Sequence, residues 1–258
     1  MANGVTACID MEFGHVYGAC RTLLMPVEVG VVLYDPDSDT PRFSGRKFAY
    51  DIDLELWQNV IDEWGVTRGV TATVANLGRS EYQKPYLRKH RLSAHRRRDA
   101  EAVCRSAFSD LRGFMEDLFD QNRVETLTFF AENMEMKAFD RAGVPVDAFG
   151  RLDLQKEIRL ELGMKDHLSL DKVARIIGFS AEGSGIASQH FRYRVPGRLR
   201  HFIKPHRALG DAARIFLLSR ELAEEGRIFA SQAQAYLAQY DLLRAGRPAA
   251  PPVGPAVT

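Results

Sequence analysis

The sequence has few cysteines, no long apolar run and almost no net charge. Its three cysteines, Cys8, Cys20 and Cys104, form no Cys-x-x-Cys pair, and this sparse, odd number is typical of a reducing compartment. No apolar run approaches the length of a membrane span, and the N-terminus lacks the charged and apolar regions of a signal peptide. We therefore expect a cytoplasmic protein without a membrane partner.

The net charge of +1 gives no overall basic character that would indicate a nucleic-acid partner, but the charges are unevenly distributed. Residues 82–98 and 183–210 contain no acid, and in both segments aromatic side chains and histidines alternate with Lys and Arg. Cationic side chains follow phosphates and rings can stack on bases, so nucleic-acid contact is one interpretation. A solvated charged face is the other, and it weighs equally for 84–98. In 188–207 we expect substrate contact from Arg192, Arg194, Arg200 and Lys204.

The apolar pattern predicts strands first and then alternating helices and strands. This order is typical of an α/β protein with a mixed β-sheet flanked by helices, in which the first strands are antiparallel. The expected strands cover residues 5–11, 25–34, 46–52 and 126–131, and the expected helices cover 98–119, 134–142, 169–177 and 208–225.

The length of 258 residues fits one large domain. We expect a single domain over residues 1–240, with an insertion at about 53–98 that the surrounding pattern does not explain. The segment 241–258 is rich in Pro, Gly and Ala, which predicts a disordered tail.

Two acids stand on alternate residues of the first apolar run. In a strand, Asp10 and Glu12 would project side by side from one face. Crowded carboxylates repel each other unless a cation lies between them, and hard oxygen ligands suit Mg²⁺ or Mn²⁺. The alternative is a strand edge with two solvated acids, and Asp-x-Glu alone is a weak signal.

A histidine and a third acid lie far along the chain, at the expected start of the last helix. On a helix, His206 and Asp211 would stand about 140° apart, so they share a site only if His206 precedes the helix. Neutral imidazole can then accept a proton from an attacking water. The alternative is a surface histidine and an acid that the helix dipole favours at its N-terminus.

Taken together, these residues resemble the DEDDh class of 3′–5′ exonucleases, which includes ribonuclease T and the proofreading subunit of bacterial DNA polymerase III. The resemblance rests on Asp-x-Glu ending a first strand and on His206-Arg-Ala-Leu-Gly-Asp211-Ala opening a late helix. Between them, residues 168–178 resemble a helix of the family, and Leu152-Asp153-Leu154 resembles the strand end before it. The resemblance spans residues 5–225 and implies a ribonuclease H-like fold.

The family has one further acid, in a helix that follows a middle strand. The best match places Glu135 where the family has aspartate, with Gly143 as the glycine that ends the helix. Glutamate is one methylene longer, which departs from the pattern. Glu132 and Asp140 are competing candidates, and a solvated helix-face acid is the plain alternative for Glu135.

The resemblance implies hydrolysis of phosphodiester bonds at nucleic-acid 3′ ends with two Mg²⁺ or Mn²⁺ ions roughly 4 Å apart. It implies that Asp10, Glu12, Glu135 and Asp211 bind the metals and that His206 is the general base. The residues beside the ligands, Met11 and Phe13, would contact the terminal nucleotide, although core packing is the simpler expectation for Phe13. Several members of the family are dimers, so a homodimer is one expected arrangement of this chain.

Three alternatives remain. One is a catalytically impaired nucleic-acid-binding relative in which Glu135 marks a decayed site, and another is a protein-interaction module of the same fold. Retention of Asp10, Glu12, His206 and Asp211 argues against the first, and the second is expected to lose several acids, which is not seen. The third is an unrelated metal phosphoesterase, whose clusters of His and Asp the sequence lacks.

Overall fold

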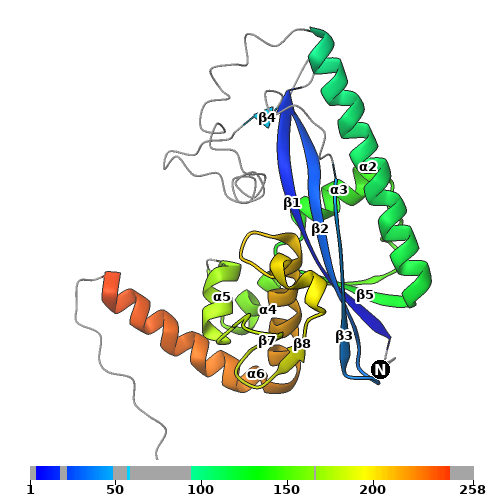
Figure 1. Ribbon diagram of the computed structural model, residues 1–258. Coiled ribbons are helices and arrows are strands. Elements are labelled where there is room, and N and C mark those ends of the chain that lie inside the picture. The colour runs from blue at the N-terminus through cyan, green and yellow to red at the C-terminus, as the bar shows by residue number, and fades with distance from the viewer. Residues whose placement is uncertain (1–3, 18–21, 49–56, 59–93, 166, 245–258) are drawn as a thin grey trace, which may run out of the picture.

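A computed structural model describes residues 4–17, 22–48, 57–58, 94–165 and 167–244 of the chain (Figure 1). The strands form a mixed sheet in the order β3-β2-β1-β5-β6, with β4 paired to the far part of β1. The neighbours β1, β2 and β3 are antiparallel, whereas β5 and β6 run parallel to β1. This sheet confirms the expected fold class and is compatible with a ribonuclease H-like arrangement.

The bounds of the strands are β1 (Val5–Tyr17), β2 (Thr22–Asp35), β3 (Thr40–Lys47), β4 (Trp57–Gln58), β5 (Val124–Phe129) and β6 (Gly150–Asp153).

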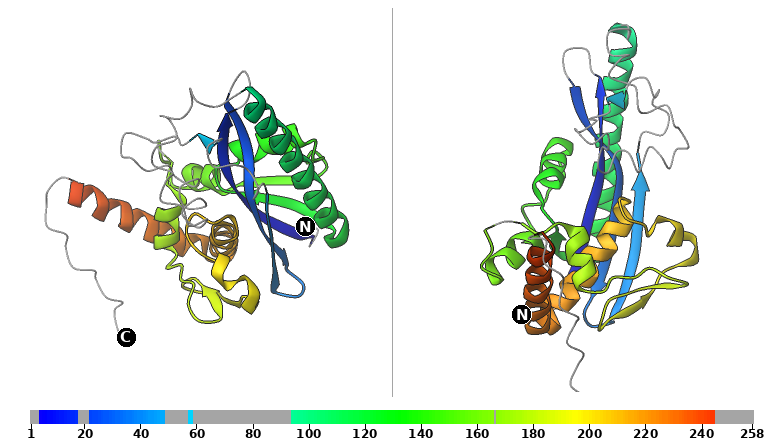
Figure 2. Two further views of the ribbon diagram at one scale, coloured as in Figure 1. Left: turned by 45° about the horizontal axis from the view of Figure 1, so that its top comes forward. Right: turned by 90° about the vertical axis from the view of Figure 1, so that its left-hand side faces the viewer.

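Helices cover both faces of the sheet. One face packs against α2, and the other packs against α6 together with α4 and α5, as the views in Figures 1 and 2 show. No helix in the described part of the chain has the length and apolar character needed to cross a membrane. The bounds are α2 (Ala94–Asn122), α3 (Asn133–Ala142), α4 (Leu154–Glu161), α5 (Leu170–Ile176), the 3₁₀ helix η5 (Gly197–Phe202) and α6 (Ala208–Arg244), and a hairpin of β7 (Gly185–Ala187) and β8 (Arg192–Arg194) lies beside α6.

Strand alternation decides which side chains of β1 face which helix. Ala7, Ile9 and Met11 lie in the core beneath α2, whereas Cys8 lies in the core beneath α6. Because successive side chains of a strand point to opposite faces, Asp10 shares the face of Cys8. The central strand therefore presents its acids to the N-terminal end of α6.

A glycine lets α6 approach the sheet closely. Gly30 pairs with Asp10 across β1 and β2, and a Cβ atom there would overlap the backbone of Ala208 and Leu209. The first turn of α6 thus rests directly on β2, beside the acids of β1. This contact brings Asp211 to the sheet.

The expected signals at helix ends are confirmed. The Ser169 side chain accepts a hydrogen bond from the backbone N–H of Lys172 and caps α5, as expected from the sequence. Gly143 ends α3 with a φ of 72°, a left-handed conformation that glycine adopts at little cost. The last helix was expected to end at residue 225, where the structure has a kink at Glu225 before the helix continues to Arg244.

Several expected boundaries differ from the structure. The first strand does not stop at residue 11, because its pairing with β2 continues through a bulge at Glu12/Phe13 to Tyr17. The third strand is Thr40–Lys47 instead of 46–52, since pairing with β2 begins directly after the turn at 36–39.

Much of the expected insertion and tail lies outside the described residues. Of the segment 53–98, the structure describes only 57–58, which pair with β1, and 94–98, which belong to α2. Of the expected tail, residues 241–244 are helical because α6 continues to Arg244, and residues 245–258 are not described.

The close approach at Gly30 predicts a large loss of stability on Gly30→Ala, because the added methyl group must displace the start of α6. We expect the free energy of unfolding to fall by about 1–3 kcal/mol or more in urea titrations. The control is Gly113→Ala in α2, where a Cβ meets nothing within 4 Å. That change should stabilise the protein by about 0.5–1 kcal/mol, and an equal effect of the two substitutions would contradict the packing described.

Candidate metal centre

Three carboxylates from two distant segments meet on the α6 face of the sheet. Oxygen atoms of Asp10, Glu12 and Asp211 all lie within 4.8 Å of one another. The first two come from the middle of β1 and the third from the first turn of α6. The structure therefore brings together the two motifs that lie almost two hundred residues apart in the sequence.

Glu135, in the first turn of α3, is the fourth acid of this region. Its side chain is buried, which raises the pKa of its carboxyl group, and the nearby backbone N–H groups of Glu135 itself and of Met11 partly oppose this rise. The Oε2 atom of Glu135 is buried and has no hydrogen-bond partner among the described residues.

The competing acids are placed differently. Glu132 precedes α3, and its carboxylate accepts from Nζ of Lys156 at 2.6 Å. Asp140 is exposed near the end of α3. Of the three candidates, Glu135 is the one that is buried and whose charge raises the pKa of Asp10. The geometry favours Glu135 as the middle acid.

Burial makes all four carboxyl groups weaker acids, and repulsion within the cluster adds to this effect for Asp10 and Glu12. Burial, followed by the charges of Asp211 and Glu12, raises the pKa of Asp10 well above its ordinary value. Burial and the charge of Asp211 raise the pKa of Glu12 to about 8, and burial raises the pKa of Glu135 to about 7. For Asp211, burial raises the pKa to about 6 although Arg214 opposes the shift. A cation in the cluster would reverse these shifts.

His206 lies directly before α6, as the expected site requires. Its φ of 58° is in the left-handed region, which costs a non-glycine residue roughly 1–2 kcal/mol. Its backbone N–H lies near the Asp211 carboxylate and opposes the rise that burial causes in the pKa of that group, and its side chain lines a pocket with Phe179 and Arg214. His206 is therefore beside the acids but outside the group whose oxygens lie within 4.8 Å.

A buried ion pair beside the acids was missed by the sequence reasoning. Glu28 on β2 stands opposite Glu12, and its Oε2 accepts from Nε of Arg207 at 2.8 Å. Both side chains are buried, and Nη2 of Arg207 has no hydrogen-bond partner among the described residues. The sequence feature that could have revealed this ion pair is Glu28, a single acid in the apolar run from Met25 to Tyr34.

The family-like helix 168–178 supports the site through an arginine that was also missed. Nη1 of Arg214 on α6 donates to Asp171 at 2.8 Å and to Asp211 at 3.1 Å. The arginine lies one helical turn after Asp211, so both can point to α5. Arg214 thus fixes the orientation of Asp211.

Core packing accounts for the two residues expected to contact the terminal nucleotide. The side chain of Met11 is buried in the core beneath α2, and Phe13 is half-buried against the same core. Of Met11, the backbone lies near the carboxylate of Glu135.

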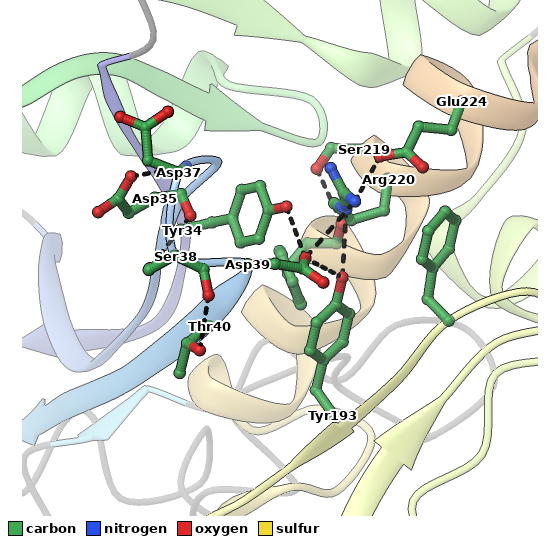
Figure 3. Close-up of polar contacts among 12 residues, drawn as sticks. Tyr34, Asp35, Asp37, Ser38, Asp39, Thr40, Tyr193, Ser219, Arg220 and Glu224 are labelled. Carbon is green, nitrogen blue, oxygen red and sulfur yellow. Dashed lines mark hydrogen bonds and ion pairs between the residues drawn. The ribbon is translucent and has the colours of Figure 1, made fainter.

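The four expected cationic contacts separate into two pairs. Arg192 and Arg194 are exposed on β8, whose Tyr193 donates to Asp39 in the turn between β2 and β3 and accepts from Arg220 (Figure 3). Arg220 lies nine residues beyond Asp211 on α6, about 13 Å along the helix axis. That hairpin is therefore anchored away from the acids.

In the second pair, Lys204 lies closer to the acids. Arg200 is exposed on η5, and the backbone of Lys204 lies against Gly210, the residue before Asp211. The other basic segment that was considered, 82–98, has no described side chains.

The donor set suits a hard divalent cation. The acids offer only oxygen, and among the described residues no basic side chain forms an ion pair with Asp10, Glu12 or Glu135. Buried charges without a partner are costly, and oxygen donors are the ligands of Mg²⁺ and Mn²⁺. The orphaned oxygen of Glu135 is consistent with such a ligand.

No family model matches this chain, and neither does any curated protein or solved structure. Its function is therefore inferred from the motifs and the geometry alone.

The raised pKa values predict how the stability of the metal-free protein depends on pH. Glu12 binds its proton more tightly in the folded chain, with a pKa of about 8 against an ordinary 4.5. The unfolding free energy should therefore fall as pH rises through this window. Thermal melts in EDTA should show this fall, and Glu12→Gln should reduce it and stabilise the protein at the alkaline end.

The exposed Asp117 on α2 provides the matched control, because Asp117→Asn should leave the pH profile unchanged. Adding Mn²⁺ should raise the melting temperature of the wild type most at the alkaline end. Parallel pH profiles of the wild type and Glu12→Gln would mean that Glu12 is not in a crowded acidic cluster.

Proposed function

We propose that the protein is a metal-dependent 3′–5′ exonuclease of the DEDDh type, which hydrolyses phosphodiester bonds at the 3′ ends of nucleic acids. The observation that carries this proposal is the meeting of Asp10, Glu12 and Asp211, with Glu135 beside them. The motifs resemble the family in sequence order, and the sheet order matches the expected architecture.

The chain offers ligands for two Mg²⁺ or Mn²⁺ ions. Asp10, Glu12, Asp211 and Glu135 would carry up to four negative charges when ionised, which two divalent ions would balance. When bound, the ions supply positive charge that stabilises the phosphoryl transition state and lowers the pKa of water. Glu28 need not contribute, because Arg207 already neutralises it.

His206 would act as the general base. Its side chain is partly exposed beside Asp211, so it can reach solvent and the acidic cluster. A neutral imidazole can accept the proton of the attacking water. Strained backbone is often found at functional sites, which is consistent with the left-handed conformation of His206.

The test is an assay on single-stranded RNA and DNA labelled at the 3′ or the 5′ end, with Mg²⁺, Mn²⁺ or EDTA. We expect metal-dependent shortening from the 3′ end and none in EDTA. Asp10→Ala should abolish cleavage while the protein stays folded. Glu135→Gln should lower the rate at least about 100-fold, because it removes a negative charge from the centre.

Asp140→Asn is the matched control, since it changes an acid of the same helix that lies away from the cluster. A larger loss for Asp140→Asn or Glu132→Gln than for Glu135→Gln would contradict the assignment of the middle acid. Binding of nucleic acid without shortening of any substrate would instead identify a catalytically impaired relative and overturn the proposed activity.

A further inference from the structure

The buried ion pair between Glu28 and Arg207 joins the start of α6 to the second strand of the sheet. The two side chains are 4 % and 5 % exposed, and Nε of the arginine lies 2.8 Å from Oε2 of the glutamate. Burying two charges costs free energy that their attraction often only balances, so such a pair is weak evidence for stability. Nη2 of Arg207 has no hydrogen-bond partner among the described residues, which adds to this cost. Stability alone therefore does not account for the pair.

Arg207 lies between the two functional residues of the second motif. Its carbonyl oxygen accepts a hydrogen bond from the backbone N–H of Asp211 at 2.9 Å, at the beginning of the turn that carries this acid. His206 directly precedes Arg207 and has a left-handed φ of 58°. A strained backbone of this kind persists where the surrounding structure holds it. An anchored Arg207 would hold the backbone of both neighbours.

The side chain of Arg207 is held on two sides, close to the acids. Its Cζ atom lies 4.9 Å from the centre of the Phe202 ring, and its ion-pair partner Glu28 pairs with Glu12 across β2 and β1. Burial raises the pKa of Glu12, and the charge of Arg207 opposes this rise. The guanidinium group is therefore near the cluster, although it forms its ion pair with Glu28.

The glycine that lets α6 approach the sheet does not fix the position of the helix along the strand. Gly30 lies two residues beyond Glu28 on the same face of β2 and leaves room for the backbone of Ala208 and Leu209. An absent side chain permits a close approach but makes no directional contact. The charge-assisted hydrogen bond of Glu28 and Arg207 is directional and joins residues 179 positions apart. It can therefore fix where on β2 the helix begins.

We propose that Glu28 and Arg207 are positioning residues whose ion pair sets the register of the start of α6 on β2, so that His206 and Asp211 meet the acids of β1. Both act through the backbone of α6 and its first turn, and neither contacts the substrate. The inference rests on the proposed nuclease function for its effect on the rate, whereas the placement of α6 is measurable without catalysis.

Hydrogen exchange of the metal-free protein, followed residue by residue by NMR, measures this placement. Glu28→Gln and Arg207→Met each leave a buried group without its partner. Both should speed exchange at the backbone N–H of Asp211 about tenfold or more, because its acceptor is the carbonyl of Arg207.

Glu221→Gln is the matched control, because it makes the same change at another buried glutamate of α6. Oε2 of Glu221 lies 2.7 Å from Nδ1 of His190. The residue stands ten positions beyond Asp211, about 15 Å along the helix axis. Glu221→Gln should leave both the exchange at Asp211 and the rate of cleavage close to those of the wild type.

The double variant Glu28→Met/Arg207→Met separates positioning from stability. Replacing both partners of a buried ion pair by apolar residues is often neutral or stabilising, so its melting temperature should lie near that of the wild type. Exchange at Asp211 should nevertheless stay fast. On a labelled single-stranded oligonucleotide with Mg²⁺, kcat should fall about 10- to 100-fold because a displacement of about 1 Å can cost about 100-fold, while KM stays within about twofold.

The outcomes for the ion pair and for the activity are separable. Wild-type exchange and wild-type kcat in the double variant would show that the pair serves stability alone and would overturn the proposal, while the nuclease function stands. An equal loss of kcat in Glu221→Gln and Glu28→Gln would also overturn it. If the wild type cleaves no substrate, the proposed function is wrong and hydrogen exchange decides: fast exchange at Asp211 in the double variant supports the positioning role, and wild-type exchange contradicts it.

Discussion

Repulsion among buried carboxylates is the constraint on which this structure depends. Asp10, Glu12 and Asp211 are held within 4.8 Å of one another by a central strand and a helix start that are packed in the core. Isolated acids would gain from moving apart into solvent, but the fold does not allow it. Holding the acids together raises their pKa values, and divalent cations would reverse this rise.

The residues around the cluster determine which acids have a basic partner and which have none. Arg207 neutralises Glu28, and Arg214 holds Asp211 against α5. Asp10 and Glu135 are left without a basic partner among the described residues. The protein thus uses arginines to fix the geometry and leaves the centre negatively charged.

The sequence predicts the fold class, and which distant acids the fold brings together, better than it predicts the limits of the strands. Alternation in β1 follows from local periodicity, which a single chain reveals, whereas the motif at 206–211 was found by its resemblance to a known family. The bulge after Glu12 and the length of β1 depend on pairing with β2, which local pattern does not encode. The ion pair of Glu28 and Arg207 joins residues 179 positions apart, so its partners could not be matched from sequence alone.

Titration with Mn²⁺, followed by the loss of the free-ion EPR signal, tests the central claim most directly. It should be done above the pKa of Glu12, which burial raises to about 8, so that the cluster is ionised. We predict about two bound ions per chain in the wild type, as two-metal centres require, and a clear loss of binding in Asp10→Asn. Absence of bound Mn²⁺, or the same stoichiometry in Asp10→Asn, would contradict a metal centre at this cluster.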